Sequence, residues 1–125
     1  MPALVDTCGW IEWLVDGPLA NHFQPWLCAP EALVVPMVLQ FELYKWVKRE
    51  RDEVMALEVV ALTEESEVVP LTSHLALTAA DFALVHRLSF ADALIYATSQ
   101  QYGIPFVTCD DHFQGLNGVE YCALS

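Results

Sequence analysis

The stretch Leu88–Phe113, LSFADALIYATSQQYGIPFVTCDDHF, decides the fold class because it holds one complete helix-to-strand unit. Ser89 is a typical helix N-cap residue, and Gly103 stands where a helix ends at a C′ position. The apolar run Ile104–Thr108 that follows has the length of a buried strand. Asp110 and a second aspartate come directly after it. The stretch therefore predicts a helix, a buried strand and an acidic strand end, in that order.

The same alternation of apolar runs and helical segments extends along the whole chain. Apolar runs predict four further strands, over Ala3–Asp6, Ala32–Pro36, Glu67–Leu71 and Val119–Leu124. Periodicity predicts a helix that starts at Gly9 and helices over Leu19–Leu27, Met37–Arg51 and Glu53–Leu62. A further helix, capped by Thr72 or Ser73, is predicted to end at about His86. Strands that alternate with helices indicate βαβ units and a mostly parallel sheet. The predicted fold class is α/β, in a single domain spanning residues 1–125.

Composition narrows the class of protein further. The chain has 125 residues, 55% of them hydrophobic, and a mean hydropathy of +0.37, which excludes a disordered chain. No apolar run reaches membrane-spanning length, and Met1–Asp6 lacks the basic start of a signal peptide. We expect a soluble cytoplasmic protein. The four cysteines lack C-x-x-C spacing, so we expect small buried apolar residues at those positions.

The charge distribution is strongly acidic. The formal net charge is −12, which argues against a general nucleic-acid coat because such a chain repels polyanions. Four of the five basic residues nevertheless cluster, at Lys45, Lys48, Arg49 and Arg51. The cluster is either a solvated helix face or a contact for phosphate or a partner.

Four carboxylates stand where burial is expected. Asp6 ends the first predicted strand and Asp110 follows the fourth, and parallel strands open their carboxyl ends on one sheet edge. Glu42 and Asp92 lie inside predicted helices, each beside apolar neighbours, where carboxylates are rarely buried without a partner. If the four acids converge, each pair about 4 Å apart repels by roughly 4 kcal/mol at an effective dielectric near 20. A hard divalent cation, Mg²⁺ or Mn²⁺, is the natural partner.

Each acid also has a structural interpretation without a ligand. Asp6 fits a helix cap, Asp92 fits a capping box with Ser89, and Asp110 fits a turn. Glu42 fits none of these, because a mid-helix acid between apolar neighbours caps nothing. The four together are therefore explained better by a shared site than by four separate caps and turns.

Three stretches resemble the PIN-domain family, and within it the VapC-like toxins of toxin–antitoxin systems. They are LVDTCGWIEWL (Leu4–Leu14), VPMVLQFELYKWV (Val35–Val47) and the opening stretch, Leu88–Phe113. The resemblance assigns the family's acids to Asp6, Glu42, Asp92 and Asp110, and a supporting hydroxyl to Thr108. The motifs occur in family order and cover nearly the whole chain.

The resemblance implies both a fold and an activity. It implies an α/β/α sandwich with a central, mostly parallel sheet of four to five strands. It implies a ribonuclease whose acids hold Mg²⁺ or Mn²⁺, with RNA as the substrate and a VapB-like antitoxin and a second copy of the chain as partners. The basic cluster, Lys45 to Arg51, would then contact RNA or the partner.

The chain departs from the family pattern at two positions. Cys8 stands where the family often has Asn, and His112 stands where many members carry a further acid. Asp111 is a weak additional candidate for a metal ligand. We expect His112 to be an ordinary loop residue, because oxygen ligands suit a hard cation.

Three other functions are compatible with clustered acids. The first is a non-catalytic PIN-like protein that only binds a partner. The second is a receiver-like signalling domain, which needs a late lysine to contact a phosphoryl group, but no lysine follows Lys48. The third is a phosphatase with Asp6 as nucleophile, but its usual second aspartate is replaced by Cys8.

Overall fold

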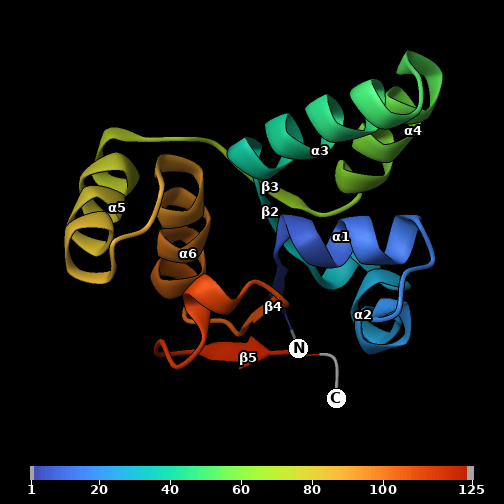
Figure 1. Ribbon diagram of the computed structural model, residues 1–125. Helices are drawn as coiled ribbons and strands as arrows, with labels where there is room; N and C mark the ends of the chain where they lie inside the picture. The colour runs from blue at the N-terminus through green and yellow to red at the C-terminus, as the bar shows by residue number, and fades with distance from the viewer. Residues whose placement is uncertain (1, 124–125) are drawn as a thin grey trace.

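The computed structural model describes residues 2–123 and shows short strands that alternate with helices (Figure 1). The strands are β1 (Leu4–Val5), β2 (Val34–Pro36), β3 (Glu67–Val69), β4 (Phe106–Thr108) and β5 (Val119–Tyr121). The helices are α1 (Thr7–Leu14), α2 (Ala20–Leu27), α3 (Met37–Glu50), α4 (Glu53–Thr63), α5 (Ser73–His86) and α6 (Phe90–Tyr102). Two 3₁₀ turns, η1 (Pro30–Ala32) and η2 (Asp111–Phe113), complete the described chain.

The strands form one parallel arrangement. β1 pairs with β4, β4 with β5, and β2 with β3, all in parallel. A parallel bridge between Ala3 and Leu33 joins the two groups, and the Val34 N–H donates to the Ala3 carbonyl oxygen at 2.9 Å. The order is therefore β3-β2-β1-β4-β5, and the strand order reverses between β1 and β4 while all strands stay parallel. The α/β class and the parallel sheet of the sequence prediction are confirmed.

The helices lie on both sides of these strands. Figure 1 shows the α5–α6 hairpin on one side and α1 with α2 on the other, while α3 and α4 extend above. This layering agrees with the predicted α/β/α sandwich. No helix within residues 2–123 is long and apolar enough to cross a membrane.

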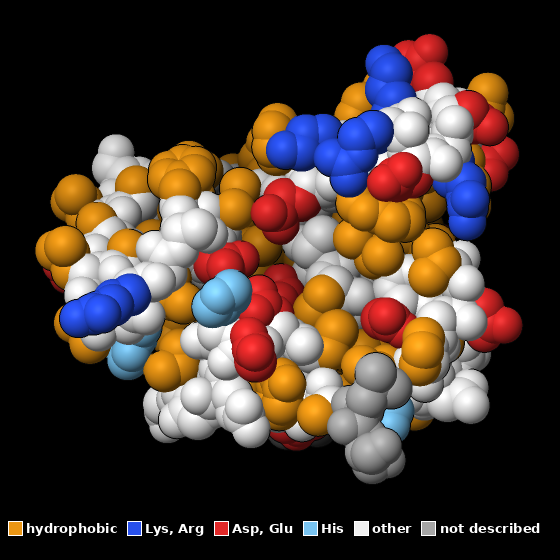
Figure 2. Space-filling view, viewed as in Figure 1, with side chains coloured by type: hydrophobic (Ala, Val, Ile, Leu, Met, Phe, Trp, Pro, Cys, Tyr) orange, Lys and Arg blue, Asp and Glu red, His pale blue; other side chains and the backbone are white. Residues whose placement is uncertain are grey.

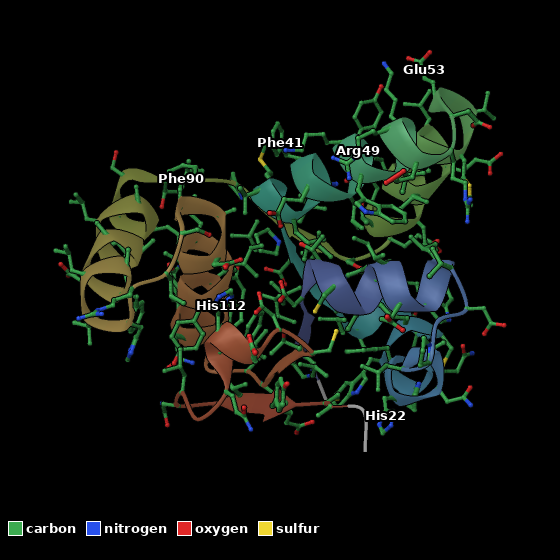
Figure 3. The ribbon with its side chains drawn as sticks, in the orientation of Figure 1. His22, Phe41, Arg49, Glu53, Phe90 and His112 are labelled. Atoms are coloured by element: carbon green, nitrogen blue, oxygen red, sulfur yellow. The ribbon has the colours of Figure 1, made fainter. Side chains whose placement is uncertain are left out.

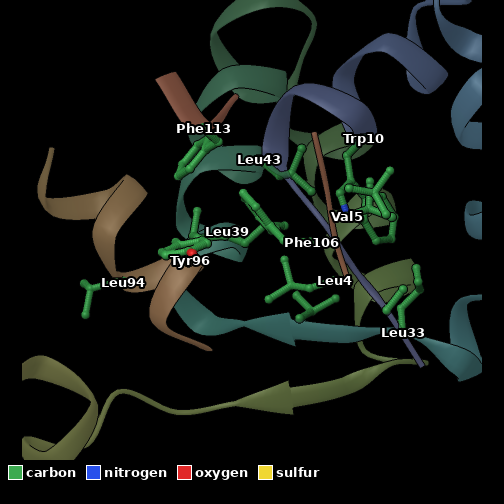
Figure 4. Packing of buried hydrophobic residues seen from close by; sticks show 14 of the residues in the cluster. Leu4, Val5, Trp10, Leu33, Leu39, Leu43, Leu94, Tyr96, Phe106 and Phe113 are labelled. Carbon is green, nitrogen blue, oxygen red and sulfur yellow. The ribbon is translucent and has the colours of Figure 1, made fainter. Parts of the chain in front are cut away.

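The core between the strands and helices is apolar and partly aromatic (Figure 4). Phe106 of β4 lies at its centre, with its ring centroid 4.8 Å from that of Phe113 and 6.0 Å from that of Tyr96. All three rings are buried, as are Leu4 and Val5 of β1. The pairing of β1 with β4 therefore places the most apolar strands in the middle of the fold.

The helix ends match the cap residues in the sequence. The Thr72 hydroxyl accepts a hydrogen bond from the Leu75 N–H at 3.2 Å, and the Ser89 hydroxyl accepts one from the Asp92 N–H at 3.3 Å. Gly103 ends α6 with φ of 62°, a left-handed conformation that glycine adopts without a steric penalty.

All five strand predictions were too long. The first predicted strand ran to Asp6, but Asp6 caps α1 and β1 ends one residue earlier. The last predicted strand ran to Leu124, which lies outside the described residues, whereas β5 ends at Tyr121. The predictions for β2, β3 and β4 each exceeded the observed strand by two residues. These errors arise because an apolar run does not show where pairing starts or stops.

Candidate active site

The four predicted acids meet in one cavity of about 290 Å³ at the carboxyl ends of β1 and β4. This edge is the point where the strand order reverses, which is where open α/β sheets bind ligands. Figure 2 shows a hollow with acidic side chains at its centre and basic side chains along one edge. The cavity is lined by Asp6, Thr7, Cys8, Ile11, Glu42, Lys45, Trp46, Arg49, Asp92 and Asp110.

Asp6 is the most deeply placed of the acids, with 4% of its surface exposed. Its Oδ1 accepts a hydrogen bond from the Thr7 N–H at 2.8 Å, and its Oδ2 accepts one from the Thr108 hydroxyl at 2.8 Å. The Thr108 hydroxyl oxygen in turn accepts the Asp110 N–H at 3.0 Å. These bonds fix the Asp6 carboxylate between the ends of two adjacent strands, and they place the Thr108 hydroxyl between Asp6 and the main chain of Asp110.

Glu42 reaches the cavity from the middle of α3. The Thr7 hydroxyl, at the first residue of α1, donates to Glu42 Oε1 at 2.6 Å. This bond joins two helices that are distant in sequence and turns the carboxylate toward the cleft. It accounts for an acid that no cap or turn explains.

Asp92 and Asp110 form the opposite wall with His112. One ligand atom from each of the three residues lies within 4.8 Å of the other two. Asp110 Oδ1 accepts the His112 N–H at 3.0 Å, and His112 Nδ1 lies 2.8 Å from the same oxygen. The side chain of His112, labelled in Figure 3, is exposed and lies beside Asp110 at the edge of the acidic cleft. The sequence suggested an ordinary loop position and showed nothing of this contact.

The electrostatics of the cleft disfavour negative charge. Burial raises the pKa of Asp6 well above its usual range, and Cys8 and Asp92 add to this shift. Burial also raises the pKa of Glu42, and the charges of Asp92 and Asp110 add to this shift. The pKa of Asp92 is raised by burial first and by the charge of Asp110 second. The cleft therefore holds carboxylates that positive charge would stabilise.

The basic cluster divides between the cavity and the solvent. Lys45 and Arg49 lie one turn apart on α3 and line the cavity. Lys48 instead lies 3.6 Å from Glu53 in an exposed ion pair. Within residues 2–123, Lys48, Arg51 and Asp111 are outside the set that lines the cavity. Two members of the cluster thus line the cavity, whereas Lys48 and Arg51 do not.

The family assignment follows from the sequence match. The PIN domain family matches residues 3–118, which is nearly the whole chain. The chain belongs to the PIN domain family. Members of this family are nucleases that typically depend on divalent metals. No curated protein matches the chain by sequence.

Solved structures share the PIN fold at low sequence identity. A chain of a toxin–antitoxin complex from Klebsiella pneumoniae is 20% identical, with a TM-score of 0.78 over 94% of this chain and 95% of that one. VapC20 of Mycobacterium tuberculosis, a toxin that cleaves the sarcin-ricin loop, is 20% identical, with a TM-score of 0.77 over 94% and 97%. A chain of DNA-bound VapBC from Salmonella typhimurium is 16% identical, with a TM-score of 0.72 over 98% of both.

The residues of this PIN domain fit a hard divalent cation. The donors in the cavity are mainly carboxylate oxygens, which Mg²⁺ and Mn²⁺ prefer. Asp6 is almost fully buried and its pKa is raised, so a bound cation would offset an existing penalty. Asp6, Glu42, Asp92 and Asp110 are the carboxylates that line the cavity, and Asp92 and Asp110 are the two whose ligand atoms lie within 4.8 Å of each other.

Two cavity residues of the PIN domain were missed as site residues by the sequence analysis. Thr7 had no pattern to mark it, because its partner Glu42 lies in another helix. Cys8 was noted only as a departure from the family, but its thiol lies 3.6 Å from Asp6 Oδ2 and 3.4 Å from the Thr108 hydroxyl. A sulfur-bearing residue two positions after a strand-end acid is the one signal that could have identified Cys8.

Proposed function

We propose that this PIN domain is a metal-dependent endoribonuclease and the toxin of a toxin–antitoxin pair. One observation carries the proposal: Asp6, Glu42, Asp92 and Asp110, from four separate segments, line one cavity with two basic residues on one wall. Membership of a nuclease family and a fold shared with VapBC proteins support the same activity. The reaction would be hydrolysis of an RNA phosphodiester, in which water adds to phosphorus and the 3′ oxygen leaves.

Each cavity residue has a role in this proposal. The four acids would hold one or two Mg²⁺ or Mn²⁺ ions, directly or through water. A bound divalent cation supplies Lewis-acid stabilisation of the phosphoryl oxygens and lowers the pKa of water. Thr108 fixes Asp6, and Thr7 fixes Glu42, so both carboxylates are oriented before RNA arrives.

Lys45 and Arg49 would bind the RNA backbone. They are the basic residues that line the cavity, and both are exposed on α3. Phosphate contacts by lysine and arginine position nucleic acid without reading its sequence. A chain with a net charge of −12 needs such a local contact to hold RNA at all.

The proposed partners follow from the same cleft. A VapB-like antitoxin would cover the acids, and an arginine or lysine from it could pair with them. Chains in toxin–antitoxin complexes share this fold, which supports such a partner. A homodimer and a cytoplasmic location complete the proposal.

The decisive experiment compares cleavage by wild type and by Asp6→Asn. Both proteins are incubated with Mn²⁺ and a panel of transfer, ribosomal and messenger RNA. We expect cleavage of a specific RNA by wild type and none by Asp6→Asn, while Asp81→Asn, an exposed acid on α5, retains activity. Circular dichroism checks that Asp6→Asn is folded. Wild-type cleavage by folded Asp6→Asn would refute the proposal.

A further inference from the structure

Two thiols lie together at the wall of the candidate active site. Cys8, the second residue of α1, lines the cavity, and Cys109 stands between Thr108 and Asp110. Both side chains are half-buried. The Cys109 N–H donates to Cys8 Sγ at 3.2 Å. The sulfur of Cys8 therefore lies against the main chain of Cys109, although the two residues come from opposite ends of the sequence.

The positions of the two residues suit a disulfide. A disulfide needs Cα atoms roughly 4.4–6.8 Å apart and side chains that approach each other. The Cys8 sulfur already contacts the amide of Cys109, and that amide is bonded to the Cα atom that bears the second thiol. Side-chain rotation can therefore bring the two sulfur atoms together without unfolding β1 or β4.

We propose that Cys8 and Cys109 form an oxidation site, which peroxide converts to an intramolecular disulfide, and that the disulfide weakens cation binding by the neighbouring acids. The second part rests on the proposed function, whereas the first does not. Redox-sensing cysteines have a low pKa, are accessible and lie next to a resolving thiol. The pair is accessible and adjacent because Cys8 lines the cavity beside Cys109. The contact between them raises the pKa of Cys8 and lowers that of Cys109, so Cys109 is the more nucleophilic thiol and Cys8 the resolving one.

The chemistry of the step balances with one peroxide. The first thiol attacks hydrogen peroxide, the O–O bond breaks, and a sulfenic acid and one water form. The second thiol then displaces the sulfenic hydroxyl as a second water and forms the S–S bond. Two thiols and one hydrogen peroxide give one disulfide and two waters, and the two electrons lost by sulfur reduce the peroxide.

The disulfide would disturb the residues that hold the acids. The Cys8 thiol lies 3.6 Å from Asp6 Oδ2 and 3.4 Å from the Thr108 hydroxyl, and these interactions would be broken. Cys109 would shift between Thr108 and Asp110. Changing residues that orient metal ligands typically weakens metal affinity by about 10- to 100-fold. We expect oxidation to weaken Mn²⁺ binding about tenfold, and reduction to restore it.

The two other cysteines provide the competing outcome and the control. Cys122 follows β5, and its N–H donates to the Thr108 carbonyl oxygen at 2.8 Å, so it neighbours Cys109 from the other side. Cys28 is exposed at the end of α2, away from the cavity. Oxidation of an exposed thiol alone would join two chains, which a non-reducing gel detects.

A peptide map identifies the bond directly. The full-length protein is treated with hydrogen peroxide, its free thiols are blocked, and it is digested without reduction by a glutamate-specific protease. Cleavage after Glu12, Glu31, Glu67 and Glu120 separates all four cysteines. We expect peptide 1–12 to be joined to peptide 68–120 and released by reductant. A link from 68–120 to 121–125, or no link at all, would overturn the proposal.

Thermal melts with Mn²⁺ test the consequence. Reduced and oxidised protein are compared, with Cys109→Ser as the test variant and Cys28→Ser as the control. Oxidation should reduce the Mn²⁺ response of wild type and Cys28→Ser but not that of Cys109→Ser. An unchanged response in mapped, oxidised wild type would overturn the second part of the proposal. Failure of reduced protein to respond to Mn²⁺ would contradict the cation site instead, while the peptide map still decides the disulfide.

Discussion

The same two strands carry the most apolar part of the core and the most acidic part of the surface. Leu4, Val5 and Phe106 are buried among aliphatic and aromatic side chains. Asp6, which directly follows β1, and Asp110, which lies two residues past β4, line a cavity together with Glu42 and Asp92. In the core each contact favours the folded state, whereas in the cleft burial raises the pKa values of the acids and opposes their charge.

This contrast shows how the molecule can keep an unfavourable site. Burial of apolar surface contributes about 25 cal/mol per Å², and a buried aromatic cluster supplies a large share of it. β1 and β4 belong to the core and also position the acids of the cleft, so the stability of the core keeps the cleft folded. Changes to the core should therefore alter stability strongly, whereas changes to the cleft should raise stability or alter ligand binding.

The largest effect is expected from removing the centre of the core. Phe106→Ala deletes a ring 4.8 Å from that of Phe113 and leaves a cavity, which should lower the free energy of unfolding by about 3–5 kcal/mol. Urea denaturation measures this. Phe41→Ala is the matched control, because Phe41 is 62% exposed and its loss should change stability by about 0.5 kcal/mol or less. Equal effects in the two variants would contradict the assignment of the core.

The second-largest effect on stability is expected from the binding of Mn²⁺. At a hundredfold excess over its dissociation constant, Mn²⁺ should stabilise wild type by about 2.7 kcal/mol, seen as a rise in melting temperature. Asp92→Asn removes the negative charge of a carboxyl group whose pKa is already raised. The melting temperature of this variant should therefore exceed that of metal-free wild type and should rise little with Mn²⁺. Asp81→Asn should respond as wild type does. If Asp92→Asn responds to Mn²⁺ as wild type does, Asp92 is not part of the cation site.

The hydrogen bond from Thr7 to Glu42 should tune the same binding. Thr7→Val keeps the shape of the side chain but loses the hydroxyl that donates at 2.6 Å, so Mn²⁺ affinity should fall about tenfold. Thr7→Ser keeps the hydroxyl and should restore most of the affinity. Titration of the melting temperature with Mn²⁺ measures both. If serine and valine behave alike, the hydroxyl does not orient Glu42.

The pH dependence of stability follows from the raised pKa values. Asp6, Glu42 and Asp92 hold their protons in the folded state at pH values where the unfolded chain has lost them. Their contribution to the stability of the metal-free protein therefore falls as pH rises from about 4, the ordinary carboxyl pKa, through the raised values. The decline should be smaller in Asp92→Asn and in the presence of Mn²⁺. Chemical denaturation across pH 4–8 tests this, and a decline of the same size in Asp92→Asn would contradict it.

The smallest effect concerns the basic residues. Replacing Lys45 and Arg49 by glutamine should weaken RNA binding and reduce its salt slope by about 0.7 for each phosphate that the variant no longer neutralises. The matched control replaces Lys48 and Arg51, which lie outside the cavity lining within the described residues. Fluorescence anisotropy with Asp6→Asn as the background avoids cleavage. Equal losses of affinity in both double variants would show that the whole cluster, and not its cavity side, attracts RNA.

The sequence predicted correctly those features of the fold that depend on residues close together in the chain. Ser89 and Gly103 marked the ends of α6, and the alternation of runs indicated the parallel sheet. Asp6 illustrates the limit of such patterns, because both interpretations of it hold: it caps α1 and also lines the cavity. A local pattern cannot show that one side chain fills two roles at once.

The remaining features depend on contacts that no local pattern contains. The bond from Thr7 to Glu42 crosses between helices, and the approach of Cys109 to Cys8 depends on the pairing of β1 with β4. The basic cluster looked uniform, but the helical rotation of α3 turns Lys45 and Arg49 toward the cavity and Lys48 toward Glu53. Strand order and helix rotation had to be known before these roles could be assigned.

The order of the strands has a consequence for synthesis on the ribosome. β1 is made first, but its neighbour on the cleft side is β4, whose pairing runs from Leu4 to Phe106. Asp110, which completes the cavity, lies later still. Because this pairing is so distant in sequence, the cleft forms only after every residue from Leu4 to Asp110 has left the exit tunnel. A nascent chain should therefore show no Mn²⁺-dependent protection from protease until residues beyond Asp110 have emerged, and any activity toward nearby RNA would begin only after that point.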